Sequence, residues 1–160
     1  MAKTNPSVII LKGNPQYREY PLAPISASGV TAITPGMLVE LASGEVRPHT
    51  TQGGDAVPMF AVEGLNIDAS SQTMGDIDTD YDDDNGAVKV ARCNHGDVVY
   101  ALLVAGESVA ADELLQSASD GYLMGYNSSS PTPLRAVGRA VDAVDNSAGT
   151  TPARVKVEVL

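Results

Sequence analysis

The segment richest in groups that could bind a ligand is residues 75–86, where aspartates stand at every second position and then in a row. Asp76, Asp78 and Asp80 are weak candidates for a hard cation such as calcium, which prefers carboxylate oxygens. The spacing departs from an EF-hand loop, which needs a glycine where Tyr81 stands. We therefore interpret the run as an acidic, solvated insertion that keeps a sheet edge soluble, and we expect no metal there.

A second group of reactive side chains is the sequence Cys93-Asn94-His95. A cysteine nucleophile needs a positioned base and a group that orients the base, and neighbours in a turn rarely meet that requirement. We interpret Cys93 as a buried residue at a strand end and His95 as a turn residue. Nothing near His49, the other histidine, marks it as a base or a ligand. Glycine-rich phosphate loops, Gly-x-Ser-x-Gly elbows and paired Cys-x-x-Cys units are missing from the sequence. The sequence therefore predicts no catalytic residues, no cofactor and no enzyme.

An internal repeat indicates how the chain is organised. Three blocks recur in the same order, namely 33–48 with 109–124, 58–62 with 133–137, and 87–90 with 154–157. The matches pair Leu38 with Leu114 and Val62 with Val137. We therefore predict two similar β-meanders, residues 33–93 and 109–160, with the acidic insertion 68–86 in the first. They should form a single β-rich domain, residues 33–160, in which matched residues are equally buried.

Hydrophobic patterning predicts an all-β fold. Val155, Val157 and Val159 alternate with charged residues, which is typical of a half-buried strand. The apolar run 98–104 is typical of a strand that is buried on both faces. Further strands are expected near 37–42, 45–48, 57–64, 87–92, 113–117, 122–126 and 133–140, and helix only as a turn or two at 110–116 and 141–146. The architecture is thus a small barrel or two packed sheets, with an extended N-terminal arm.

The N-terminal residues 1–32 differ from the rest of the chain. A short apolar run is followed by prolines that interrupt regular pairing, and large apolar residues continue between them. This pattern favours an extended arm that lies on another subunit or protein over a free, solvated tail. The candidate partner-binding residues are Val8, Ile9, Ile10, Leu11, Tyr17 and Tyr20.

Composition excludes several classes of partner. The chain of 160 residues carries a formal charge of −10, which would repel nucleic acids and anionic membranes. A single cysteine rules out an internal disulfide and is typical of a reducing cytoplasm. We also expect neither a transmembrane segment nor a secretory signal. Phe60 is the only phenylalanine and tryptophan is absent, so the core is lean and neighbouring subunits are expected to add stability.

About the last two-thirds of the chain resemble a known family, most clearly in the segments 109–123, 135–145 and 153–160 and more loosely in 33–46 and 60–65. An entry turn, a Ser-x-Gly-type hairpin turn, the string Ala-Val-Gly-x-Ala and a charge-alternating last strand resemble the small head-decoration (capsid cement) proteins of tailed bacteriophages. The resemblance implies a compact β-fold, commonly homotrimeric, whose N-terminal arm joins the sheet of a major capsid protein subunit, without enzymatic activity. It also implies a location on the capsid exterior of the virion after synthesis in the host cytoplasm.

Two other kinds of function remain open on the sequence. One is a different virion structural protein, such as a tail or fibre-base adaptor, which would assemble into fibres rather than on an icosahedral lattice. The other is a calcium-dependent carbohydrate-binding module. Such modules usually use exposed aromatic residues, and Tyr81, Tyr122 and Tyr126 are few and scattered.

Overall fold

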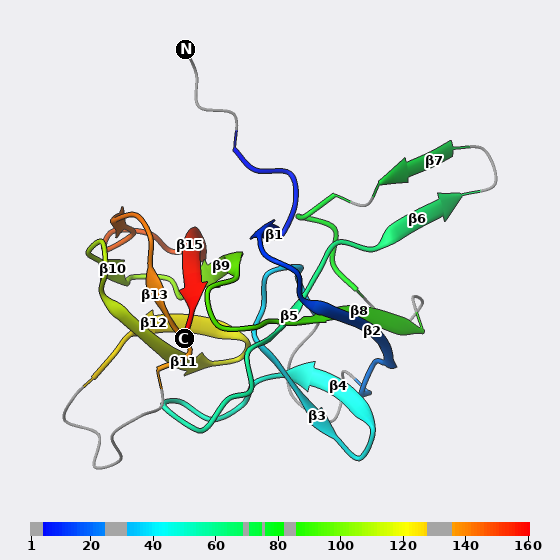
Figure 1. The fold of residues 1–160 in the computed structure, drawn as a ribbon, viewed down its shortest axis with the longest axis horizontal. Helices are drawn as coiled ribbons and strands as arrows, with labels where there is room; N and C mark the ends of the chain where they lie inside the picture. Colours follow the sequence, from blue (N-terminus) through cyan, green and yellow to red (C-terminus); the bar gives the residue numbers. More distant parts are fainter. Residues whose placement is uncertain (1–4, 25–31, 69–70, 75, 82–85, 128–135) are drawn as a thin grey trace.

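The computed structural model describes residues 5–24, 32–68, 71–74, 76–81, 86–127 and 136–160, and every regular element in them is a β-strand (Figure 1). The all-β prediction is therefore confirmed. The strands are β1 (Ile10–Lys12), β2 (Gln16–Pro21), β3 (Val39–Ala42), β4 (Glu45–Pro48), β5 (Met59–Ala61), β6 (Leu65–Asp68), β7 (Ser71–Met74), β8 (Ala87–Arg92), β9 (Val98–Leu103), β10 (Ser108–Val109), β11 (Leu114–Ser119), β12 (Tyr122–Gly125), β13 (Gly138–Ala140), β14 (Val144–Asp145) and β15 (Ala153–Val159).

Five strands of the second half pair in a closed ring. Their order is β9-β12-β11-β13-β15, and β15 pairs again with β9. Every pairing is antiparallel except that of β9 with β12, where Leu103 and Leu123 form a parallel bridge. The continuous apolar run predicted a strand buried on both faces, and residues 99–103 of β9 are indeed all buried.

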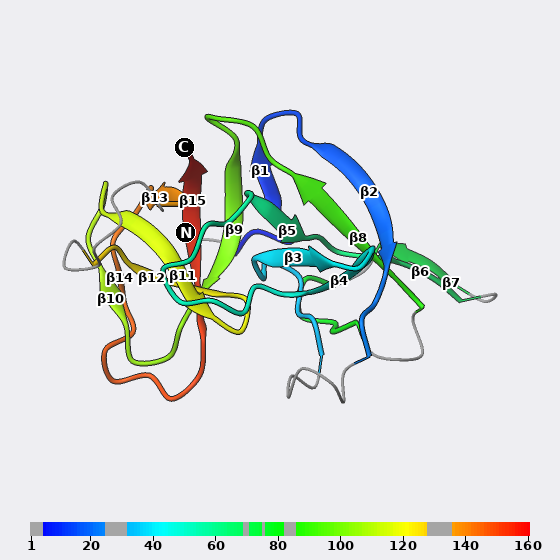
Figure 2. The ribbon, with the colours of Figure 1, turned by 90° about the horizontal axis from the view of Figure 1, so that it is seen from below.

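The first half has the same ring of five strands, but isolated bridges replace some of the strand pairings. The sheet β2-β8-β5 is connected to the β3-β4 hairpin by an antiparallel bridge between Phe60 and Leu38. A parallel bridge between Leu22 and Val46 connects the hairpin back to the end of β2. The cyclic order is therefore β2-β4-β3-β5-β8, the counterpart of the second ring. Figure 2 shows the two strand groups side by side, with β2 at the outer rim.

Main-chain hydrogen bonds establish which strands correspond. Just after β2, the N–H of Ala23 donates to the Val46 carbonyl of β4 over 2.9 Å. Just after β9, the N–H of Val104 donates in the same way to the Leu123 carbonyl of β12 over 2.9 Å. Strand β2 is therefore the counterpart of β9. The first repeat accordingly begins at Gln16, inside the segment that the sequence analysis assigned to an arm.

The last two strands of each ring share one register. Ala61 is paired with Val90 in the first ring, and Ala140 with Val157 in the second. This register confirms the sequence match between 87–90 and 154–157. It corrects the match between 58–62 and 133–137, because the counterpart of Ala61 is Ala140 rather than Ala136. The shared Ala-Val pair was a coincidence of composition, and only the strand partners identify the right residue.

The hairpin turns also correspond, with one difference. Ser43 and Gly44 both have positive φ, at 55° and 87°, as a tight turn between β3 and β4 requires. In the second repeat Ser119, Asp120 and Gly121 all have positive φ, and the register shifts between Ser117 and Ser119. A bulge thus accommodates the one residue by which the second turn is longer than the first.

The matched leucines are not equally buried, which corrects the prediction made from the repeat. Leu38 is fully buried, whereas Leu114 is 40% exposed. The same contrast separates Phe60 and Val62 from their counterparts Arg139 and Val141. The outward face of the first ring packs against the second ring, whereas among the described strands no third ring covers the same face of the second. Val62 and Val137 are both buried, but they hold different places in their rings.

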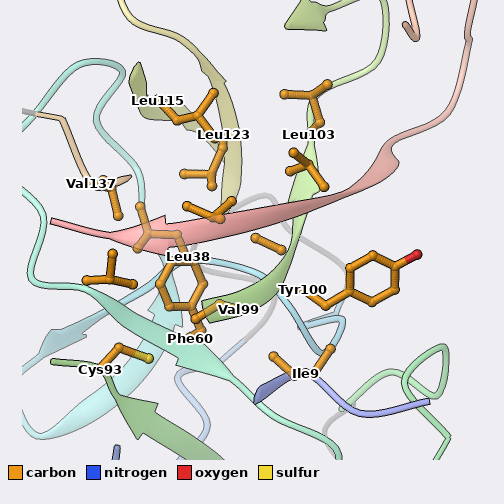
Figure 3. Close-up of a cluster of buried hydrophobic side chains, with 14 of the residues drawn as sticks. Ile9, Leu38, Phe60, Cys93, Val99, Tyr100, Leu103, Leu115, Leu123 and Val137 are labelled. Carbon is orange, nitrogen blue, oxygen red and sulfur yellow. The ribbon is translucent and has the colours of Figure 1, made fainter. Parts of the chain in front are cut away.

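The core consists of two clusters. The larger one includes Phe60 and Leu38 from the first ring together with Val99 and Leu123 from the second, so it joins the two halves (Figure 3). The smaller one fills the inside of the first ring and includes Val39, Val46, Val88 and Val90, with Leu102 of β9 reaching into it. The two repeats therefore share one hydrophobic interior.

The N-terminal segment is part of this folded body. Strand β1 pairs with β9, Ile9 is fully buried in the larger cluster, and β2 pairs along its whole length with β8. Two of the prolines that suggested an irregular arm stand at the ends of β2: Pro15 precedes it, and Pro21 is its last residue. Strands tolerate proline at their ends. The boundary expected at residue 33 therefore does not separate an arm from a body. The described hairpin β6-β7 was also not predicted; the last residue of β6 and the whole of β7 lie within the polar insertion 68–86.

Candidate functional site

The most compact group of polar side chains lies where the two rings meet. His49 is 2% exposed, and its Nδ1 lies 2.8 Å from Oγ of Ser117. Its Nε2 lies 3.1 Å from the Asp55 carbonyl and 3.7 Å from a carboxylate oxygen of Glu40. A carbonyl can only accept, so Nε2 donates to Asp55; in the neutral ring, Nδ1 then accepts from the Ser117 hydroxyl. Serine, histidine and glutamate here have the composition of a nucleophile with its base and orienting group.

The burial of these side chains indicates that the group has a structural role. Ser117 is fully buried, so a substrate would have no path to its hydroxyl in this conformation. The main chain around it links the repeats: Gly121 N–H donates to the His49 carbonyl over 3.2 Å, and Leu38 N–H to the Gly121 carbonyl over 2.8 Å. His49 therefore fastens the first ring to the second. Sequence reasoning missed this pair because Ser117 and His49 are far apart in the chain and neither lies in a recognisable motif.

The Cys93 region has the geometry that the sequence analysis anticipated. Cys93 directly follows β8 and is 6% exposed, while His95 is exposed in the following turn. Burial, and to a smaller extent the charge of Asp97, raises the pKa of the Cys93 thiol to about 12. A thiol with such a pKa stays protonated at neutral pH and is a poor nucleophile. The interpretation of Cys93 as a buried strand-end residue is confirmed.

The acidic insertion alternates exposed carboxylates with buried anchors. Asp76, Asp78 and Asp80 are all exposed, as predicted for a solvated segment. Between them Ile77 is buried, and Tyr81 is 7% exposed with its hydroxyl donating to the Val62 carbonyl over 2.6 Å. Burial raises the pKa of Tyr81 to about 12. Asp82–Asp84 lie outside the described residues.

The three described aspartates make separate contacts rather than converging on a common centre. Asp78 accepts a hydrogen bond from Arg154 at 3.1 Å, and Asp80 accepts one from the Thr34 hydroxyl at 2.7 Å. Asp76 accepts from the main-chain N–H of Asp78. Within the described ranges, no group of three histidine, cysteine, aspartate or glutamate side chains is arranged to hold a metal ion.

A shallow cleft of about 270 Å³ lies beside this insertion, lined by Thr34, Asp78, Leu102, Tyr122, Pro152 and Arg154. Its one cation, Arg154, is already bound. The guanidinium donates to the carbonyls of Pro35 and Ile77 at 2.6 and 2.7 Å, besides its contact with Asp78. These bonds tie the insertion and the Pro35 turn to β15, which is a structural role.

The six candidate partner-binding residues are divided by the fold. Ile9 is a core residue, and the side chains of Val8, Ile10 and Leu11 are half-buried. Tyr20 is half-buried against the smaller cluster, whereas Tyr17 is 49% exposed on the outer face of β2. The structure therefore does not gather the six into one surface, and Tyr17 is the member most accessible to another molecule.

Basic side chains gather around the same strand. Eight lysines and arginines lie in the described part of the chain, and Arg47, Arg139, Arg154 and Lys156 form ion pairs with carboxylates. The four that form none there are Lys12, Arg18, Lys89 and Arg92, which all lie on β1, β2 and β8. The Lys89 ammonium instead lies 5.0 Å from the centre of the Tyr17 ring. Tyr17 and Lys89 lie on one face of the β2-β8 sheet, whereas Arg18 and Arg92 lie on the other. We call this set, Lys12, Tyr17, Arg18, Lys89 and Arg92, the basic rim.

Comparisons with known proteins add no identification. No family model matches the sequence, and a search of curated proteins gives no significant match. Across the described residues, no helix has the length and apolar character needed to cross a membrane.

Proposed function

We propose that this chain is a structural virion protein that binds the outside of a phage capsid and stabilises its lattice, without enzymatic activity or a cofactor. Its partners would be the major capsid protein and further copies of itself in a homotrimer. The resemblance of residues 109–160 to head-decoration proteins suggests this function, and the surface described above supports it.

The observation that carries the proposal is the basic rim. On a chain with a net charge of −10, four described cations form no ion pair with a carboxylate. Arg18 and Arg92 lie on one face of the β2-β8 sheet, and Lys89 lies on the other face beside the exposed Tyr17. Charge complementarity of this kind steers association and sets orientation. Tyrosine and arginine are also the residues enriched in the energetically important parts of interfaces. The border of the sheet at β2, which carries cations on both of its faces, thus suits the attachment of another protein.

The exposed aspartates support an orientation in which the basic rim faces the capsid and the acidic insertion faces solvent. Asp76, Asp78 and Asp80 carry the negative charge into solvent, and none of them pairs with a cation of the rim. Carboxylates are costly to bury without cations, so this part of the surface would face away from the shell. An acidic outer surface would also keep decorated particles from associating with one another.

The test uses capsids assembled without this protein, to which the purified chain is added. We expect it to bind in a regular array in electron micrographs and to raise the temperature at which the capsids rupture. Tyr17→Ala with Arg18→Gln should weaken binding by at least tenfold. The matched control is Leu41→Ala with Arg139→Gln, which changes an exposed apolar residue and an exposed arginine elsewhere. Absence of binding, or assembly of the free protein into fibres, would contradict the proposal.

A further inference from the structure

The two rings differ in what lies along their equivalent edges. Strand β9 carries β1 on its outer edge, where Ile10 is paired with Val99 and Tyr100 N–H donates to the Ile9 carbonyl over 2.7 Å. The counterparts of Val99 and Tyr100 on β2 are Arg18 and Glu19, since β2 corresponds to β9. In the first repeat, no described strand lies along that edge, and β2 is the terminal strand of its sheet.

Within the described part of the chain, the outer edge of β2 at residues 17–19 is unpaired, which leaves it accessible to another molecule. Residues 16–19 are all exposed, and Figure 2 shows β2 at the rim of the molecule with β8 on its inner side. An edge strand presents unpaired N–H and C=O groups, which is the arrangement that accepts an added strand. Within this same chain the corresponding edge is occupied by an antiparallel strand, so the ring geometry is compatible with such an addition.

The open edge of β2 carries basic side chains where the occupied edge of β9 carries apolar ones, and this difference favours an acidic partner. Val99 and Val159, which close the end of the second ring, are replaced in the first by Arg18 and Arg92. With Gln16, Tyr20, Met59 and Val90, these arginines line a small hollow. A residue added opposite Arg18 would point to the same face of the sheet, where a carboxylate could pair with a guanidinium.

From these observations we infer that the open edge of β2 is a docking site for an extended, acidic segment of another protein. The segment adds antiparallel to β2, its main chain bonds to residues 17–19, and its carboxylates meet Arg18 and Arg92. Strand β1 of a second copy does not satisfy this requirement, because β1 is Ile-Leu-Lys and brings a cation instead of a carboxylate. The inference rests on the internal repeat and does not depend on capsid binding.

The test is a titration of the purified, ¹⁵N-labelled full chain with a capped peptide of alternating glutamate and valine, seven residues by design. We expect saturable shifts of the Tyr17 and Glu19 amide signals. Affinity should fall at least tenfold in a variant that combines Arg18→Gln with Arg92→Gln. The control Arg139→Gln, an exposed arginine on β13, should bind like the unmodified protein, and circular dichroism checks that each variant is folded.

Two further peptides distinguish strand addition from plain charge attraction. The same sequence with lysine in place of glutamate should not bind. A glutamate peptide that is N-methylated at alternate residues should not bind either, because it cannot donate to the edge of β2. Binding of either peptide, shifts confined to other residues, or no saturable shift at millimolar peptide would overturn the inference. Shifts at Tyr17 and Glu19 that depend on protein concentration alone would show that a second copy occupies the edge, and would overturn it too.

Discussion

Replacing Leu38 and Leu114 with alanine, each alone, would measure how differently the two rings are packed. The two leucines hold equivalent places, since Leu38 bridges Phe60 as Leu114 pairs with Arg139. Leu38 is fully buried where the rings meet, whereas Leu114 is 40% exposed. The chain thus provides its own matched control.

The expected costs follow from burial. A fully buried leucine contributes about 1.5–3 kcal/mol through removal from water, and truncation adds the cost of a cavity. Because residues of both rings surround Leu38, we expect Leu38→Ala to cost about 3–4 kcal/mol. Leu114 loses only part of its transfer free energy and leaves a site open to water, so we expect about 1 kcal/mol or less. For a chain of this size the difference is roughly 4–12 °C in melting temperature.

Urea denaturation at low protein concentration, with thermal melting as a second measurement, would provide both costs. The m-values of the two variants should agree, so that the midpoints report stability alone. Equal losses for Leu38→Ala and Leu114→Ala would refute the reasoning. That result would mean that the face around Leu114 is as well covered as the junction of the rings.

Four other outcomes are expected. Cys93 should react with a thiol reagent at pH 8 only as fast as the protein unfolds, because burial raises its pKa to about 12; rapid reaction of the native protein would contradict this. Tyr81→Phe should cost about 1–3 kcal/mol, because it leaves the buried Val62 carbonyl without its donor. Burial raises the folded-state pKa of Tyr81 from the ordinary tyrosine value of 10.0 to about 12, so its contribution to stability is constant below pH 10 and is lost as pH rises from 10 to 12. Denaturation from pH 9 to 12 should therefore show a steeper loss for the unmodified protein than for Tyr81→Phe. Calcium should not shift the melting temperature, and a variant that combines Asp78→Asn with Asp80→Asn should melt at the same temperature with calcium or with a chelator. A calcium-dependent shift that this variant abolishes would establish a metal site. Ile9→Ala should lower the free energy of unfolding by about 2–5 kcal/mol, whereas deletion of residues 2–7 should leave the melting temperature nearly unchanged.

The sequence predicted the local elements better than their partners. Alternating valines placed β15, and the Ser-Gly turn placed the β3-β4 hairpin, because period and turn chemistry are local properties. Strand β2 was missed because Pro15 and Pro21 suggest coil. A terminal strand tolerates proline at its ends, but only the pairing with β8 reveals that β2 is one.

The internal repeat was likewise predicted without its correct strand correspondence. Its existence was visible in the order of the matched blocks, yet the counterpart of Ala61 was placed at Ala136 instead of Ala140. Strand partners decide that correspondence, and they come from distant parts of the chain. The burial of Leu38 was likewise predictable, whereas the exposure of Leu114 depends on which faces of the two rings meet.

The candidate site was predicted only in part. The exposure of Asp76, Asp78 and Asp80 and the burial of Cys93 followed from composition and spacing. The contact between His49 and Ser117 joins residues from different repeats, and so does not appear as a motif. The basic rim is also non-local, because most of it comes from β2 and β8, which are far apart in the sequence and pair in the sheet.

The loop that connects the last two strands is much longer in the first ring than in the second, yet the strand order of the two rings is the same. Residues 62–86 link β5 to β8, and the shorter stretch 141–152 links β13 to β15, yet both strand pairs keep the same register. Lengthening such a loop costs little, about 0.6 kcal/mol for each doubling. In the first ring Tyr81 holds the returning end through its bridge to Ile33. The hairpin β6-β7 before it is therefore a natural graft position, where a foreign peptide could replace the hairpin and be displayed while both rings stay intact.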